Sequence, residues 1–117
     1  YGMDDRVFER ASAFGATIEP TTDPSTVVDD ADVVYTDVWI SMGQEELKHE
    51  KLAAFDGFQV NESLLDGTDA YLMHCLPAHR GEEVTDEVLE SPRSLVWQQA
   101  ENRMHAQNAL LVELLDA

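Results

Sequence analysis

The sequence predicts an α/β fold in which helices flank an open parallel sheet. Along the 117 residues, segments with the spacing of amphipathic helices alternate with short apolar runs of strand length. No internal repeat, low-complexity tract or linker-like stretch interrupts this alternation. Alternating helices and strands are typical of parallel sheets, because each crossover between parallel strands needs a helix. We therefore expect one open α/β domain.

The first half of the chain is expected to begin with a helix over 4–14. Asp4 and Asp5 precede apolar residues at helical spacing, and Gly15 is placed to close the helix. Pro24 fits the first turn of a second helix, where a missing backbone N–H costs nothing. The elements expected after helix 4–14 are an extended segment at 16–19, a short helix at 23–30, a strand at 32–36 and an amphipathic helix at 45–55.

The second half is expected to contain two further strands and a long closing helix. The apolar run 70–73 has the length of a buried strand. Before this strand, Asn61 can cap the amino-terminal end of a short helix. The expected elements are an extended segment at 58–60, a short helix at 61–65, a strand at 70–73, a short helix at 85–90, a strand at 94–97 and a helix at 98–116.

Charge and composition exclude several classes of function. Twenty-four acidic against seven basic residues give a formal charge of −17, which repels nucleic acid and anionic membranes. No apolar run approaches the roughly 20 residues of a membrane span, and the start does not have the profile of a signal peptide. The single cysteine cannot form an internal disulfide and fits a reducing compartment. We expect a soluble, cytoplasmic protein that binds neither nucleic acid nor membrane.

Three polar segments are candidates for a ligand site. Segment 37–44 reads Asp-Val-Trp-Ile-Ser-Met-Gly-Gln and follows the strand at 32–36, whereas 74–81 reads His-Cys-Leu-Pro-Ala-His-Arg-Gly and follows the strand at 70–73. The third segment, 101–107, opens the last helical pattern with Glu-Asn-Arg-Met-His-Ala-Gln. Open α/β sheets bind ligands at the carboxyl ends of their strands, which is where the first two segments lie.

Structural roles compete with functional ones at each candidate residue. Asp37 could be a turn or capping residue, Cys75 a small buried hydrophobic residue, and Arg103 a solvated arginine. A nucleophilic dyad of Cys75 with His74 has no identifiable oxyanion partner. A metal site formed by His74, Cys75 and His79 does not match common zinc spacings. We therefore expect no metal site at these residues.

Together, the three segments resemble ornithine carbamoyltransferases. In that family an aspartate followed by Ser-Met-Gly, a His-Cys-Leu-Pro turn and a late arginine line the sites for ornithine and carbamoyl phosphate. The resemblance implies a Rossmann-like, ornithine-binding second domain over 1–117, including the helix at 98–116. The first strand of that domain and the whole carbamoyl phosphate domain have no counterpart here. The chain is therefore expected to be an incomplete domain from the carboxyl-terminal third of an enzyme.

The resemblance also assigns roles on the ornithine side of the site. Asp37 would pair with the α-ammonium group of ornithine through a charge-assisted hydrogen bond. Ser41 offers a hydroxyl, and backbone amides around Met42 and Gly43 can face the carboxylate. In the family, this loop closes over ornithine.

On the reacting side, Cys75 would lie beside the δ-amine that attacks the carbamoyl group. Leu76 would offer its backbone carbonyl to the carbamoyl NH2 group, and the bond between Leu76 and Pro77 is expected to be cis. Arg103 would polarise the carbamoyl oxygen, since a guanidinium is a permanently charged, planar donor. The reaction that the resemblance implies converts carbamoyl phosphate and L-ornithine to L-citrulline and phosphate in arginine metabolism, with no metal and no organic cofactor.

Two alternative functions are also compatible with the sequence. The acceptor could be another amine such as putrescine, although Asp37 and the Ser-Met-Gly segment favour an α-amino acid. The chain could also be a catalytically silent amino-acid-binding subunit, because it contains no phosphate-binding arginine loop. The resemblance implies a homotrimer or higher oligomer for the full-length protein.

The acid-rich, lysine-poor composition predicts a fold that is stabilised by salt. It resembles that of proteins from salt-loving archaea, and molar salt shortens the Debye length to about 3 Å, which screens repulsion among acidic side chains. We expect the melting temperature, followed by circular dichroism, to be lower in dilute buffer than in molar KCl. An unchanged melting temperature would contradict stabilisation of the fold by salt.

Overall fold

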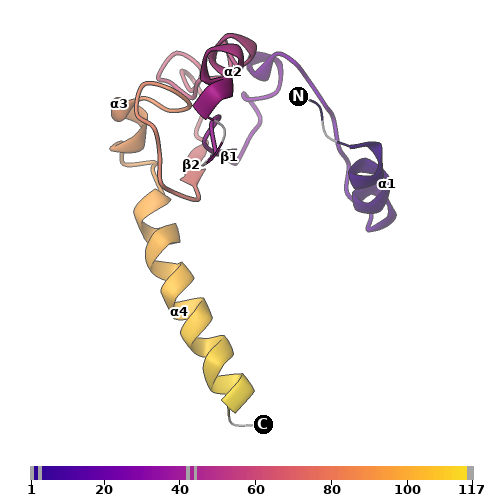
Figure 1. The fold of residues 1–117 in the computed structure, drawn as a ribbon, viewed down its shortest axis with the longest axis vertical. Coiled ribbons are helices and arrows are strands. Elements are labelled where there is room, and N and C mark those ends of the chain that lie inside the picture. The colour runs from indigo at the N-terminus through magenta and orange to yellow at the C-terminus, as the bar shows by residue number, and fades with distance from the viewer. Residues whose placement is uncertain (1, 3, 42, 44, 116–117) are drawn as a thin grey trace.

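The computed structural model describes residues 2, 4–41, 43 and 45–115, which form a central body and two outlying helices (Figure 1). Helix α1 (Asp5–Ala13) lies apart from the body at the end of an extended segment, and α4 (Val96–Leu115) runs outward from it. The Cα radius of gyration is 16.7 Å, whereas a compact domain of this length would have about 13 Å. The core is therefore confined to the central body.

The sheet consists of two parallel strands in the described part of the chain. Strand β1 (Val33–Thr36) pairs with β2 (Tyr71–His74), and Thr36 lies opposite His74 at the carboxyl ends. Both strands lie at their predicted positions to within one or two residues. The small open parallel sheet with flanking helices confirms the predicted fold class.

The predicted strand at 94–97 is wrong. Leu72 donates its backbone N–H to Arg93 and accepts a hydrogen bond from the backbone of Leu95, which gives one isolated bridge. The chain then becomes helical at Val96, so Ser94 is the one residue of segment 94–97 that pairs with β2. Helix α4 therefore begins two residues before the predicted start, and residue 116 lies outside the described residues.

Two other segments that were expected to be extended also form no strand. Segment 16–19 has no backbone ladder, and within 58–60 only Val60 is paired, through a single bridge to Val84. An extended segment becomes a strand only when successive residues meet a partner edge. Segment 16–19 pairs with no other segment, and segment 58–60 pairs at one residue only.

The helices agree with the sequence where a cap or an apolar face defines them. Asp4 caps α1 by accepting a hydrogen bond from the backbone of Arg6. The predicted helix at 23–30 is wrong in extent, because only one 3-10 turn forms, and 61–65 forms hydrogen-bonded turns instead of a helix. The remaining elements are η1 (Pro24–Thr26), η2 (Glu45–Leu47), α2 (Lys48–Ala54) and α3 (Asp86–Leu89).

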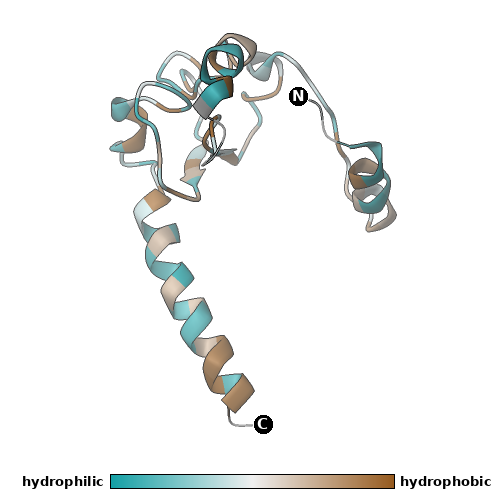
Figure 2. Ribbon diagram, in the orientation of Figure 1, coloured by the Kyte–Doolittle hydropathy of each residue, from teal (hydrophilic) through white to brown (hydrophobic). Residues whose placement is uncertain are grey.

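The core packs one face of the small sheet against α3 and the first turn of α4. Its buried members are Val28, Val60, Leu65, Leu72, Val84, Val88, Leu89 and Val96. Beyond this core, the last turns of α4 carry a band of apolar residues (Figure 2), and Leu114 and Leu115 are 65% and 81% exposed. No helix within the described ranges combines the length and apolar character needed to cross a membrane.

Truncating Leu72 is expected to destabilise the fold, because its side chain is fully buried where β2 meets the start of α4. We expect Leu72→Ala to lower the free energy of unfolding by about 2–5 kcal/mol in urea denaturation. Leu47→Ala serves as the control, since Leu47 is 44% exposed. Equal losses of unfolding free energy in both variants would contradict the assignment of Leu72 to the core.

Candidate active site

The parallel pairing brings Asp37 and Cys75 together, although 37 residues separate them in the sequence. Each residue directly follows a strand, and the Cys75 thiol donates a hydrogen bond to Oδ1 of Asp37 at 3.0 Å. The same oxygen accepts the backbone N–H of Val38 at 2.7 Å. Cys75 is exposed, which contradicts the alternative that it is a buried hydrophobic residue.

The thiol and the carboxylate shift each other's pKa in opposite directions. The hydrogen bond from Cys75 lowers the pKa of Asp37, despite partial burial, and the hydrogen bond from the Val38 N–H also favours the charged form. The hydrogen bond to Asp37 raises the pKa of Cys75, and burial and the negative charge add to this rise. The pair therefore presents an ionised carboxylate beside a protonated thiol.

Leu76 adopts a backbone conformation that non-glycine residues seldom occupy. Its φ is 56°, the following bond to Pro77 is cis as expected, and its N–H donates to Nδ1 of His74 at 2.8 Å. A left-handed conformation at such a residue costs on the order of 1–3 kcal/mol and persists only where surrounding contacts impose it. The conformation of Leu76 therefore depends on how His74 is held.

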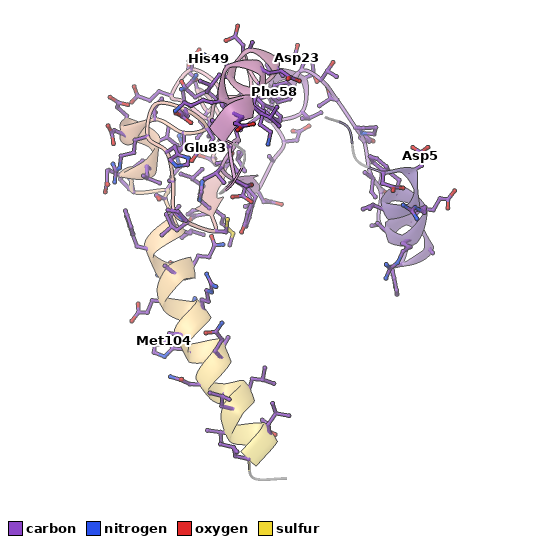
Figure 3. The ribbon with its side chains drawn as sticks, viewed as in Figure 1. Asp5, Asp23, His49, Phe58, Glu83 and Met104 are labelled. Carbon is purple, nitrogen blue, oxygen red and sulfur yellow. The ribbon has the colours of Figure 1, made fainter. Side chains whose placement is uncertain are left out.

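His74 is held by Glu83, a residue to which sequence analysis gave no role in the site. Because Nδ1 of His74 accepts from Leu76, its proton lies on Nε2, which donates to Oε1 of Glu83 at 3.1 Å. Glu83 lies in the central body (Figure 3), where both side chains are fully buried. The same carboxylate oxygen accepts the backbone N–H of His79 and so fixes the far side of the turn.

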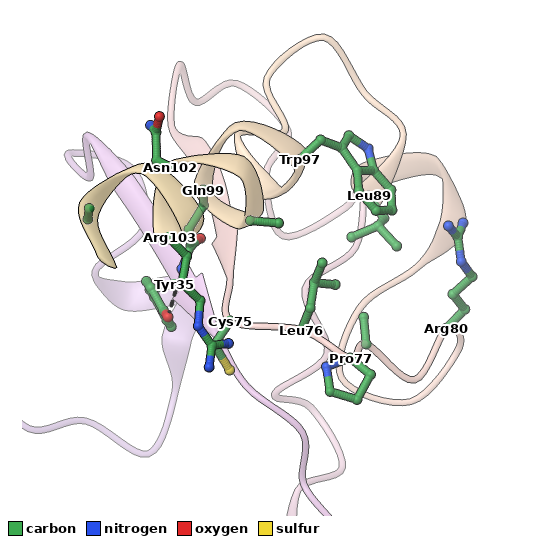
Figure 4. Close-up of a pocket in the computed structure, with 13 residues that line it drawn as sticks. Tyr35, Cys75, Leu76, Pro77, Arg80, Leu89, Trp97, Gln99, Asn102 and Arg103 are labelled. Carbon is green, nitrogen blue, oxygen red and sulfur yellow. Dashed lines mark hydrogen bonds between the residues drawn. The ribbon is translucent and has the colours of Figure 1, made fainter. Parts of the chain in front are cut away.

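An open cavity of about 950 Å³ lies beside the turn (Figure 4). Cys75, Leu76 and Arg103 line it, and in this view the side chain of Arg103 extends from α4 toward the turn. Tyr35 and Gln99 also line this cavity, and they are joined by a hydrogen bond of 2.9 Å. The structure thus brings the three predicted residues of the reacting side into one cavity.

A second cavity, of about 480 Å³, lies along the loop that follows β1. Asp37 and Ser41 line it, and Tyr35 lines both cavities. Gly43 has a φ of 84°, which is open to glycine and agrees with the tight turn expected there. Met42 lies outside the described residues. The predicted residues other than Met42 therefore line two cavities that share Tyr35 and are linked by the Asp37–Cys75 hydrogen bond.

The sequence predicts no metal site, but one group of potential ligands occurs among the described residues. The three residues considered in the sequence, His74, Cys75 and His79, do not group together, because His74 is engaged by Glu83 and Leu76. Instead, His79 lies near Glu82 and Glu83, with one potential ligand atom from each within 4.8 Å of the others.

Comparisons of sequence and of structure with known proteins point to the same family. The sequence model described as aspartate/ornithine carbamoyltransferase, Asp/Orn binding domain, matches residues 1–114. Ornithine carbamoyltransferase from Haloquadratum walsbyi is 64% identical over 115 residues, covering 98% of this chain and 38% of that protein. The catabolic enzyme of that name from Halobacterium salinarum is 51% identical over 115 residues, covering 97% of this chain and 38% of that protein.

A solved structure gives the same match in three dimensions. Ornithine carbamoyltransferase from Pyrococcus furiosus superposes with a TM-score of 0.82 at 52% identity, covering 95% of this chain and 37% of that chain. The present chain therefore spans little more than a third of the length of these relatives.

Removing the charge of Asp37 is expected to lower the pKa of Cys75. We expect Asp37→Asn to shift the midpoint of Cys75 alkylation by iodoacetamide to lower pH, since a neutral acceptor no longer opposes the thiolate. Asp32→Asn is the matched control, because Asp32 precedes the opposite end of β1. An unchanged midpoint in Asp37→Asn, or an equal shift in the control, would contradict the assigned electrostatics.

Proposed function

Because the chain belongs to the aspartate/ornithine carbamoyltransferase family, we propose that it forms the ornithine side of an enzyme that transfers a carbamoyl group from carbamoyl phosphate to the δ-amine of L-ornithine. The products are L-citrulline and phosphate. Residues 1–117 would be part of the ornithine-binding domain, and a carbamoyl phosphate domain outside this sequence would bind the phosphate. The observation that carries the proposal is the Asp37–Cys75 hydrogen bond at the edge of a cavity that Arg103 also lines.

Asp37 is proposed to bind the α-ammonium group of ornithine. Its Oδ1 accepts hydrogen bonds from Cys75 and Val38, which leaves Oδ2 available for a cationic donor. The lowered pKa of Asp37 supports this role, because an ionised carboxylate forms the stronger bond with an ammonium group. Ser41 and Met42 would bind the carboxylate end of the same ligand from the loop after β1.

Cys75 is proposed to orient the δ-amine for attack. The reaction joins the amine nitrogen to the carbamoyl carbon, breaks the bond from that carbon to the phosphate oxygen, and releases a proton from nitrogen. The raised pKa of Cys75 favours a neutral sulfur that accepts a hydrogen bond from the amine over a thiolate that removes its proton. Correct placement of two reactants can supply a large share of the rate acceleration.

Leu76 and Arg103 are proposed to hold the carbamoyl group. The hydrogen bond from Leu76 to His74 fixes the backbone of the turn, so that the Leu76 carbonyl can accept from the carbamoyl NH2 group. Arg103 lines the same cavity, where its charge would stabilise the oxygen as negative charge develops there. No step in this scheme uses a metal or an organic cofactor.

The setting of the reaction follows from the same family relationship. The reaction would belong to arginine metabolism, and the free, exposed thiol of Cys75 fits a reducing cytoplasm. The net charge of −17, together with the similarity to a haloarchaeal enzyme, supports function in high salt. The full-length protein is proposed to assemble as a homotrimer or higher oligomer.

The full-length polypeptide in molar KCl should form citrulline from carbamoyl phosphate and ornithine. We expect Asp37→Ala to raise KM for ornithine at least about tenfold, the effect of losing one charged hydrogen bond. We expect Cys75→Ala mainly to lower kcat. Asp29→Ala, which removes an exposed acid outside both cavities, is the control.

Two outcomes would contradict the proposed function. Equal turnover of putrescine would show that no α-amino-acid clamp exists. Binding of ornithine without any citrulline formation would instead favour a silent amino-acid-binding subunit.

A further inference from the structure

The side chain of Gln99 connects helix α4 to both strands of the sheet. Its Oε1 accepts the backbone N–H of His74 on β2 at 3.1 Å, and its Nε2 donates to the Tyr35 hydroxyl on β1 at 2.9 Å (Figure 4). Because a backbone N–H only donates, Oε1 must face His74, and the NH2 group is thereby directed to Tyr35. One amide group therefore joins three elements near the carboxyl ends of the strands.

The remainder of α4 is attached to the central body only near its start. Val96 is buried in the core, whereas every residue from 101 to 115 is exposed. Among the described residues, no other side chain of α4 is hydrogen-bonded to the sheet, and Arg103 forms no hydrogen bond or ion pair. The direction in which α4 leaves the body is therefore set at its first turn, where Val96 packs and Gln99 is hydrogen-bonded.

This first turn determines where Arg103 lies. Gln99 precedes Arg103 by one helical turn and is on the same face of α4. Four residues of an α-helix span about 6 Å, so a tilt of about 20° at Gln99 would move the backbone of Arg103 by about 2 Å. A misplacement of about 1 Å in a group that positions a reactant can lower a rate by about a hundredfold. A small change in helix direction would therefore matter at the cavity.

We propose that Gln99 is a positioning residue, which holds Arg103 at the cavity by fixing the direction of α4 relative to the strand ends. The catalytic significance rests on the proposed function of Arg103, but the two hydrogen bonds of Gln99 do not. Arg103 would act on the carbamoyl oxygen as negative charge develops there, so its displacement would slow the reaction more than it weakens ornithine binding. Asp37, which would bind the α-ammonium group, is instead hydrogen-bonded to Cys75 and to its own loop.

The test compares kcat and the KM for ornithine in variants of the full-length polypeptide. Gln99→Met removes both hydrogen bonds but keeps a side chain of similar length and helix propensity. Gln99→Glu keeps an acceptor for the His74 N–H, and its second oxygen can accept a hydrogen bond from the Tyr35 hydroxyl. We expect Gln99→Met to lower kcat at least about tenfold with little change in KM, and Gln99→Glu to keep most of the activity.

Gln98→Met is the matched control, because it makes the same change at the neighbouring, exposed position of α4. We expect no loss of kcat there. Equal losses in Gln98→Met and Gln99→Met, or equal losses in the two Gln99 variants, would overturn the proposal. An unchanged kcat in Gln99→Met would do the same.

Hydrogen–deuterium exchange of the His74 backbone amide tests the contact without any citrulline formation. We expect Gln99→Met to speed this exchange roughly threefold to tenfold, the effect of losing one hydrogen bond, and Gln99→Glu and Gln98→Met to leave it unchanged. Unchanged exchange in Gln99→Met would overturn the proposal. Faster exchange in Gln99→Met, in an enzyme that forms no citrulline even without substitution, would instead refute the proposed function, and with it the catalytic role of Gln99.

Discussion

The parallel pairing of β1 with β2 is the constraint on which the site depends. Thr36 lies opposite His74, so the two residues that follow, Asp37 and Cys75, emerge at the same edge of the sheet. A strand advances about 3.3 Å per residue. A slip of one residue would therefore displace Asp37 relative to Cys75 by more than the 3.0 Å length of their hydrogen bond. It would also turn the buried side chain of Leu72 away from the core. Burial in the core therefore fixes the register, and the register fixes the site.

Hydrogen bonds among polar side chains behind this edge then fix the conformation of the turn after β2. The His74–Glu83 pair holds the turn from inside the core, and Gln99 holds it from α4. Hydrogen bonds in a low-dielectric interior are strong, and an unpaired member would be costly, so such a network favours one arrangement of the turn. The unusual backbone of Leu76 is maintained by this network. The groups that face the cavity can therefore remain exposed to ligand while the atoms behind them are fixed.

Much of the site could be predicted because its residues follow strands whose apolar runs are evident in the sequence. The positions of Asp37 and Cys75 followed from such runs and from two short motifs, whereas Arg103 was predicted from the motif at 101–107 within the closing helix. The contributions of Tyr35, Glu83 and Gln99 could not be predicted, since each depends on a contact between distant elements. The strand expected at 94–97 failed for a related reason: an apolar run is compatible with strand or helix, and at Val96 tertiary context selected the helix.

The central claim is that Asp37 and Cys75 act as one unit in binding and orienting the amine. A double-mutant cycle tests it directly, using kcat/KM for citrulline formation by the full-length wild type, Asp37→Asn, Cys75→Ala and the double variant. We expect the two effects to be non-additive, with a coupling energy of about 1 kcal/mol or more, as is found for residues in direct contact. Losses that add without coupling would show that the two residues act independently, and would contradict a single shared site.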